Sequence, residues 1–346
     1  MKKNHSFLFH NKKKRKYFLL IFQNKKIKYL VLILNILFLF YYDDMIVEGK
    51  FFKNKNETSF ENKNETFFKI KNETSFENKN ETFFKNNNLV KEDLTIVTAL
   101  YKIKSKHPFD YYLKWVNNFL KINKPIIFFI DPKISDIVKG KRSAKFNNKT
   151  KWIELEMKDF YIYKNYLKYF KETNKIDVEN NIHSVELYIV WAEKIVFLKK
   201  AININPFNSK CFYWVDAGYL REEYYSSEFL DNWPSTKRCL EDPRITFITV
   251  RQSVINEINN FATLHMTKGF FRTTNVAAGF FGGTPFYILK FYEKYFETIK
   301  KWYDHSIFIG KEQNVFASVI YLNPKYCKYV YPGKNGQWYY PMEYFS

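Results

Sequence analysis

The sequence predicts an α/β fold in which a mainly parallel sheet is covered by helices on both faces. From about Asp93 onward, short apolar runs of strand length alternate with longer segments that have the apolar spacing of helices. The strand-like runs are continuously apolar, which is typical of strands buried on both faces of a parallel sheet. With 346 residues, 46% of them hydrophobic, the chain is long enough to bury a sizeable core.

The expected strands are short apolar runs, and several of them end at or beside an acid, a proline or a glycine. These runs are Leu94–Tyr101, Pro125–Asp131, Trp152–Glu156, Phe212–Val215, Ile245–Val250 and Asn275–Gly283. Each expected helix repeats apolar residues every three or four positions, as at Phe109, Leu113, Val116 and Leu120. These segments are Phe109–Ile122, His183–Ala201, Pro285–Asp304 and Glu312–Leu322.

Three segments precede this expected α/β domain, which spans residues 93–346. Residues 1–28 carry ten Lys or Arg and no acid, and residues 29–42 are uncharged and apolar. A basic tail favours a cytosolic N-terminus, so we expect a type II signal-anchor in the membrane. The rest of the chain would then lie in the lumen of the ER or Golgi of a eukaryotic host. The alternative is a cleaved signal peptide, whose apolar region has this length.

Residues 43–92 form a polar stem that contains an internal repeat. The sequence KNETSFENKNETFFK occurs at 55–69 and again at 71–85, and it is too polar to bury a core. Each Asn-Glu-Thr triplet within it is an acceptor sequence for N-glycosylation, unless a recent duplication produced the triplets by accident. The predicted glycosylation sites are Asn56, Asn64, Asn72 and Asn80, with Asn148 as a further candidate.

The net charge of +21 does not indicate nucleic-acid binding. The tail carries ten of these positive charges, and acids are mixed with bases along the rest of the chain. The three cysteines, Cys211, Cys239 and Cys327, include no C-x-x-C pair, so they indicate neither a metal site nor a disulfide framework. One pair could form in an oxidising lumen, and the spacing does not say which.

Asp216 is the first candidate site residue. It ends the aromatic run in CFYWVDAGYLR and is followed by Gly218. A carboxylate at the end of a buried strand is costly unless something compensates its charge. Mn²⁺ or Mg²⁺ bound together with a diphosphate would do so, so Asp216 is a predicted metal ligand. The alternative is a strand cap that accepts hydrogen bonds from turn amides.

The glycines of AAGFFGGT are candidates for binding a ligand through the backbone. Gly279, Gly282 and Gly283 lack side chains and allow close approach. Pro285 then begins a helix whose N-terminus favours anions. A tight turn from strand to helix would explain at least one of these glycines equally well.

Other candidates lie at strand ends and on helices. Ligands bind at the carboxyl ends of parallel strands, so Thr98, Ala99 and Tyr101 are candidate contacts to a bound ligand. Lys194 shares one helix face with Leu187, Val190 and Trp191, and it is either a phosphate contact or a solvated charge.

Glu312 and Gln313 begin the last long helix in the segment FIGKEQN. Glu312 is a candidate base for an acceptor hydroxyl, and Gln313 a candidate donor contact. The alternative for Glu312 is an acid that complements the helix dipole.

Together, in their order and spacing, four segments resemble the HtrL/YibB family, also called WlaTC/HtrL glycosyltransferases. The segments are TIVTALY, ELYIVWAEKIVFLKKAININPFNSKCFYWVDAGYLR, NVAAGFFGGT and FIGKEQNVFAS, within Leu94–Tyr331. The resemblance implies a GT-A-like fold and sugar transfer from a nucleotide donor. It also implies that Asp216 stands where GT-A enzymes carry Asp-x-Asp, although the motif here is Val-Asp-Ala-Gly with one acid.

The sequence therefore predicts a glycosyltransferase that moves a sugar from a nucleotide-diphosphate donor to a glycan, protein or lipid hydroxyl. The alternative is a non-catalytic or sugar-binding type II membrane protein that keeps the fold. Turnover of a nucleotide sugar separates the two hypotheses.

Overall fold

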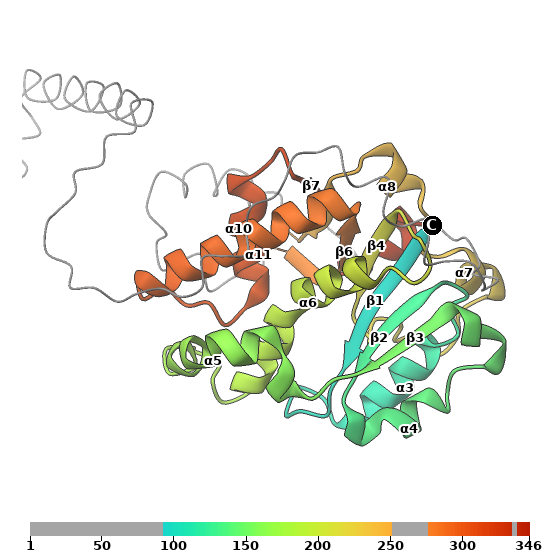
Figure 1. The fold of residues 1–346 in the computed structure, drawn as a ribbon, viewed down its shortest axis with the longest axis horizontal. Helices are drawn as coiled ribbons and strands as arrows, with labels where there is room; N and C mark the ends of the chain where they lie inside the picture. Colours follow the sequence, from blue (N-terminus) through green and yellow to red (C-terminus); the bar gives the residue numbers. More distant parts are fainter. Residues whose placement is uncertain (1–92, 251–275, 334–337) are drawn as a thin grey trace, which may run out of the picture. The chain divides into compact units, whose positions relative to one another are not determined.

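A seven-stranded sheet forms the centre of the part of the chain that the computed structural model describes, residues 93–250, 276–333 and 338–346 (Figure 1). The strand order is β3-β2-β1-β4-β6-β5-β7. The strands are β1 (Leu94–Leu100), β2 (Ile126–Ile130), β3 (Thr150–Glu154), β4 (Cys211–Val215), β5 (Ile245–Thr249), β6 (Val276–Gly283) and β7 (Cys327–Val330).

Strand β6 runs antiparallel to both of its neighbours, β4 and β5, whereas the other neighbouring strands pair in parallel. The prediction of a mainly parallel sheet is therefore confirmed, with β6 as the exception. Its register places Phe280 opposite Val215 and Gly283 opposite Phe212. The first half of β6 thus lies beside the carboxyl end of β4, and its last residues lie at the opposite end.

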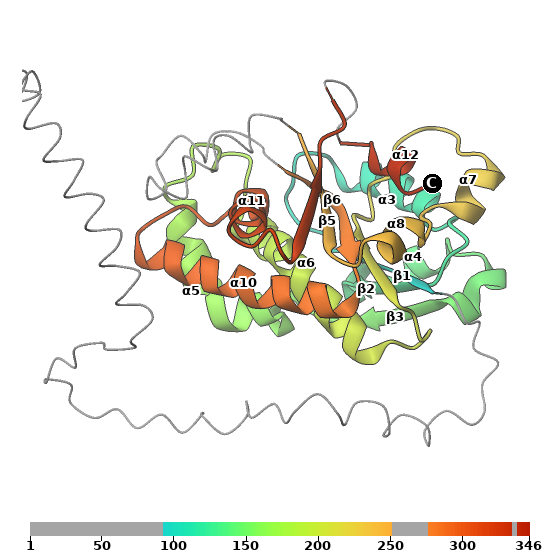
Figure 2. The ribbon, with the colours of Figure 1, turned by 90° about the horizontal axis from the view of Figure 1, so that it is seen from above.

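Helices cover both faces of the sheet (Figure 2). They are α3 (Phe109–Phe119), α4 (Ser135–Lys139), α5 (Tyr161–Asn174), α6 (Val185–Ile204), α7 (Ser227–Asn232), α8 (Lys237–Glu241), α10 (Pro285–Asp304), α11 (Glu312–Leu322) and α12 (Pro341–Tyr344). The four long helices predicted from the sequence correspond to α3, α6, α10 and α11. Helix α5 was not predicted, because its lysines and tyrosines obscure the apolar period and only Ile162, Phe170 and Thr173 are buried.

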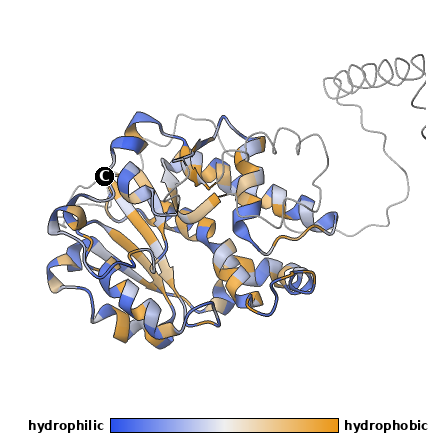
Figure 3. Ribbon diagram, turned by 180° about the vertical axis from the view of Figure 1, so that it is seen from behind, coloured by the Kyte–Doolittle hydropathy of each residue, from blue (hydrophilic) through white to orange (hydrophobic). Residues whose placement is uncertain are grey.

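Successive residues of each central strand belong to two different cores. Val97, Ile127 and Trp214 pack with the core that includes α6, α10 and α11. Their neighbours Ile96 and Phe128 pack with the core that includes α3. Figure 3 shows the sheet as largely hydrophobic, with helices that are hydrophobic on part of their surface and hydrophilic elsewhere. Burial on both faces explains why the strand sequences are continuously apolar.

Helix α6 positions much of the cavity described below. Ser184 caps its start, where the Leu187 amide donates to Ser184 Oγ at 3.2 Å. Asn205 ends it in the left-handed conformation, with φ of 30°. Most of the helix between them is buried, because it contacts β1 and β4 on one side and α5 and α10 on another. A helix that is apolar nearly all round is expected to occupy such a central place.

A disulfide joins Cys211 at the start of β4 to Cys239 in α8. This pairing answers the question that cysteine spacing left open. Cys327, in β7, is a buried free thiol, and burial raises its pKa. Disulfides are typical of proteins that fold in an oxidising compartment.

The tail, the predicted anchor (29–42) and the stem with its four acceptor sequences lie outside the described residues. Among the residues that are described, no helix has both the length and the apolar character needed to cross a membrane. Asn148 is described, and it is exposed in the 3₁₀ turn Ala144–Lys149. An enzyme could therefore reach its side chain.

Candidate functional site

A cavity of about 630 Å³ opens where β1 and β4 reach their carboxyl ends. Ala99 and Tyr101 line it from β1 and the residue that follows, and Asp216 lines it just after β4. The face of α6 that was predicted from sequence spacing, Leu187, Val190, Trp191 and Lys194, also lines the cavity. The site therefore lies where ligands bind in α/β sheets.

Lys194 is the centre of the charged part of this cavity. Its side chain is only 4% exposed, and Nζ lies 3.0 Å from Glu312 Oε1 and 3.1 Å from Asp216 Oδ1. Nζ also donates to the Ala278 carbonyl oxygen at 3.2 Å. An ammonium group has three donors, so these partners satisfy it completely. Lys194 is thus neither a solvated charge nor free to bind a phosphate without giving up a partner.

The two carboxylates keep Lys194 protonated. Burial alone would lower the pKa of Lys194, but the charges of Asp216 and Glu312 outweigh it and the pKa is raised. Burial likewise raises the pKa of Glu312, and Lys194 opposes that rise. A buried carboxyl with a raised pKa at the edge of a cavity is a candidate for proton transfer.

Asp216 is oriented by its neighbours and remains open to the cavity. Trp214 Nε1 donates to Asp216 Oδ1 at 2.7 Å, and the backbone amide of Asp216 donates to the Gly279 carbonyl oxygen at 2.9 Å. Its side chain is nevertheless 41% exposed. An oriented, accessible carboxylate can accept hydrogen bonds from the hydroxyl groups of a ligand.

The structure brings together seven of the residues predicted to form the site and leaves three of them apart. The seven that line the cavity are Ala99, Tyr101, Lys194, Asp216, Gly279, Glu312 and Gln313. Tyr101 also has a buried hydroxyl with no hydrogen-bond partner among the described residues. Thr98, Gly282 and Gly283 are not part of the cavity lining. Thr98 is buried within β1, paired with Phe128.

Gly282 and Gly283 have a packing role that follows from the direction of β6. Since β6 is antiparallel to β4, its last residues lie away from the cavity. A Cβ at Gly282 would come within 2.1 Å of the Phe212 carbonyl oxygen, and one at Gly283 within 2.8 Å of the Arg244 carbonyl oxygen. These glycines allow the backbone of β6 to lie close to the backbones of its neighbours, and they are not placed to contact a ligand in the cavity.

We predict that Gly282→Ala lowers the free energy of unfolding by about 3 kcal/mol or more, because its methyl group would overlap the backbone of β4. Gly279→Ala should cost much less stability, since its nearest contacts are side-chain atoms at 3.3 Å or beyond. Equilibrium unfolding in denaturant measures both. Equal losses in the two variants would contradict the distinction between a packing glycine and a cavity glycine.

The residues around Asp216 do not fit the predicted divalent cation. Hard cations take several oxygen ligands, which can be one or two carboxylates together with waters and substrate phosphates. Among the described residues, Glu312 cannot join Asp216 as a ligand, because Lys194 lies between the two carboxylates and is bonded to both. A metal ion on Asp216 would also stand next to the Lys194 ammonium group, which repels it.

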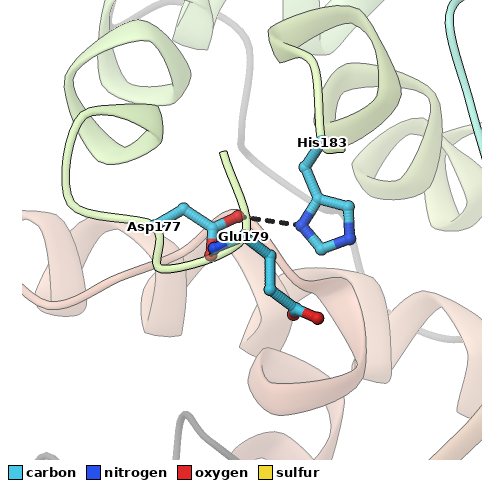
Figure 4. A group of neighbouring side chains, drawn as sticks. All are labelled: Asp177, Glu179 and His183. Atoms are coloured by element: carbon cyan, nitrogen blue, oxygen red, sulfur yellow. Dashed lines mark hydrogen bonds and ion pairs between the residues drawn. The ribbon is translucent and has the colours of Figure 1, made fainter. Parts of the chain in front are cut away.

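A second group, Asp177, Glu179 and His183, has ligand atoms within 4.8 Å of one another, close enough to surround a metal ion. Asp177 Oδ2 and His183 Nδ1 lie 2.8 Å apart (Figure 4). Tyr188 also donates to Asp177, and Lys311 pairs with Glu179. Both carboxylates thus already have protein partners, and of the three residues only His183 lines the cavity.

Several polar and aromatic residues of the cavity were not predicted from the sequence. Arg221 follows the strand that carries Asp216, and Lys106 and His107 follow β1. Trp338 and Tyr339 reach the cavity from near the end of the chain. Arg221 is the last residue of CFYWVDAGYLR, the stretch that contains Asp216. A single arginine in a loop has no characteristic spacing from other residues, so the sequence did not mark it as a site residue.

Comparison with known proteins identifies the family. The profile of the HtrL_YibB family, described as bacterial protein of unknown function, matches residues 92–346. No curated protein matches the chain. Among solved structures, core-mannan synthase A (CmsA/Ktr4) from Aspergillus fumigatus, in its Mn/GDP form, is 10% identical, with 72% of this chain and 75% of that chain covered and a TM-score of 0.37. A similarity of that size supports no conclusion about the site. The match over the whole described domain shows that the chain belongs to the HtrL_YibB family.

Proposed function

We propose that the domain is a glycosyltransferase that moves a sugar from a nucleotide-diphosphate donor to a hydroxyl of a glycan, protein or lipid. The observation that carries the proposal is the buried Lys194, held between two carboxylates that line one cavity at the carboxyl ends of β1 and β4. The volume of the cavity, about 630 Å³, is in the range of small-molecule and cofactor sites.

In this proposal, Asp216 binds the donor and Glu312 acts on the acceptor. Asp216 accepts hydrogen bonds from donor hydroxyl groups with its exposed oxygen. Glu312 takes the proton of the acceptor hydroxyl, whose oxygen forms the new bond to the anomeric carbon. The bond from that carbon to the phosphate oxygen breaks, and its electron pair leaves with the nucleoside diphosphate. Lys194 keeps both carboxylates in place.

The test is titration of nucleotide sugars by calorimetry, with release of nucleotide scored in parallel. Wild-type protein should bind at least one nucleotide sugar, and Asp216→Asn should weaken that binding about 10- to 100-fold, the worth of a hydrogen bond to a charged group. The free energy of unfolding should change little. The amide oxygen of Asn can still accept the hydrogen bond from Trp214 Nε1, and Lys194 keeps its ion pair with Glu312. The titration and the nucleotide-release assay are each carried out once with Mn²⁺ and once with a chelator.

Asp131→Asn is the matched control. Asp131 also follows a parallel strand, but its side chain accepts from the Lys133 amide at 3.0 Å and does not line the cavity. Its substitution should leave donor affinity unchanged. Unchanged affinity in Asp216→Asn, with a lowered melting temperature, would instead make Asp216 a strand cap. Binding of donor without turnover on any acceptor would favour the sugar-binding alternative.

A further inference from the structure

We propose that Arg221, Lys106 and His107 form an anion site that holds the diphosphate of the donor without a divalent cation. That the anion belongs to a nucleotide sugar rests on the proposed function, but the anion site itself rests on the following geometry.

The charges that line the cavity do not balance locally. Three Lys or Arg residues line it, against two acids. Both acids are already bonded to Lys194. Arg221 and Lys106 are left over, and neither forms an ion pair with any acid that the structure describes. The lining therefore carries a net excess of one positive charge, and a cavity that presents two cations without ion pairs is expected to attract an anion.

Arg221 is held in place without using its terminal nitrogens. Nε donates to the Gly218 carbonyl oxygen at 3.1 Å, and the guanidinium carbon lies 4.4 Å from the centre of the Trp115 ring. Within the described ranges, its two terminal nitrogens have no protein partner. A guanidinium fixed by stacking, with both terminal nitrogens free, is suited to bind two phosphate oxygens at once.

His107 and Lys106 bring further donors to the same place from the loop after β1. The His107 ring packs edge-on against Trp115, with ring centres 5.2 Å apart, so Arg221 and His107 share one aromatic support. Burial, together with the charges of Arg221 and Lys106, lowers the pKa of His107. The positive charges of Arg221 and Lys106 thus both act on the His107 ring, and a bound anion would offset them.

These cations supply what a metal would otherwise supply. A departing diphosphate needs positive charge, and among the described residues the Lys194 ammonium group beside Asp216 disfavours a metal ion there. Arg221 and Asp216 belong to the same connection after β4 and line the same cavity. A donor could thus place its hydroxyl groups on Asp216 and its phosphates on Arg221.

The experiment titrates inorganic pyrophosphate, uridine diphosphate, guanosine diphosphate and inorganic phosphate into the full chain, in excess EDTA. Pyrophosphate should bind, and Arg221→Gln should weaken its binding about 10- to 100-fold. Replacing EDTA with Mn²⁺ should not strengthen it. A nucleoside diphosphate that binds more tightly than pyrophosphate would identify a nucleotide as the source of the anion.

Arg238→Gln is the matched control. Arg238 also stacks on an aromatic ring, at 4.7 Å from the centre of Tyr344, and donates to a backbone carbonyl, but it does not line the cavity. Its substitution should not change pyrophosphate affinity. Any of three results would overturn the anion site. Pyrophosphate does not bind, it binds only with Mn²⁺, or it binds Arg221→Gln as tightly as wild type.

The two proposals fail in different ways. If pyrophosphate binds through Arg221 but no nucleotide sugar binds or turns over, the anion site stands and the glycosyltransferase fails. If a nucleotide sugar turns over only with Mn²⁺, or turns over equally well in Arg221→Gln, the glycosyltransferase stands and the anion site fails.

Discussion

Lys194→Met should lower the free energy of unfolding by about 3–5 kcal/mol, as expected when one partner of a buried ion pair is removed. The substitution keeps most of the side-chain volume and removes the charge. Glu312, whose side chain is 4% exposed, would then be a buried carboxylate without a cation. Equilibrium unfolding in denaturant at neutral pH measures the loss.

A double variant separates the ion pair from packing. In Lys194→Met with Glu312→Leu, neither of the two charges remains buried, so most of the lost stability should return. Lys200→Met is the matched control on the same helix. Its partner Glu193 is also buried, but it keeps hydrogen bonds from the backbone amides of α5, so the loss should be smaller. If the double variant is no more stable than Lys194→Met, the ion pair is not the cause.

Glu312→Gln should lower turnover about 10²- to 10⁴-fold, the usual effect of removing a general base. An amide has nearly the shape of a carboxyl group and its oxygen can still accept from Lys194, so the fold should be retained. In wild type, the rate should fall as pH falls through the pKa of Glu312, which burial raises above its ordinary value of 4.5. This acid-side fall should be absent from the variant. Nucleotide release from whichever nucleotide sugar binds in the calorimetric titration measures both.

Glu186→Gln tests whether any acid in the first turn of a helix would have the same effect. Glu186 begins α6, is exposed and does not line the cavity. Its substitution should leave turnover unchanged. Turnover within a few-fold of wild type in Glu312→Gln would make Glu312 an anchor for Lys194 only. A loss of donor affinity with unchanged turnover would lead to the same conclusion.

The helix and strand patterns located most of the site because they depend on local spacing and burial. The spacing of Leu187, Val190, Trp191 and Lys194 placed them on one face of α6, and all four line the cavity. A period of 3.6 residues is a property of the helix itself and needs no knowledge of distant residues. The run Phe212–Val215 predicts a buried strand for the same reason; the structure has β4 at Cys211–Val215, and Asp216 follows its carboxyl end.

Other features depend on which segments meet, and the sequence alone does not reveal this. Lys194 is predicted from the sequence as either a phosphate contact or a solvated charge, but it pairs with Glu312, 118 residues away.

Sequence patterns were enough to predict the α/β class, the strand that precedes Asp216 and the helix face that lines the cavity. Each follows from local patterns of burial. The tertiary structure alone decided the direction of β6, and with it the packing role of Gly282 and Gly283. It also decided the disulfide partners and the meeting of Arg221 with His107 around Trp115. The direction of a strand and the partner of a charge depend on the path of the whole chain, because contacts between distant segments form only when the sheet and its helices assemble.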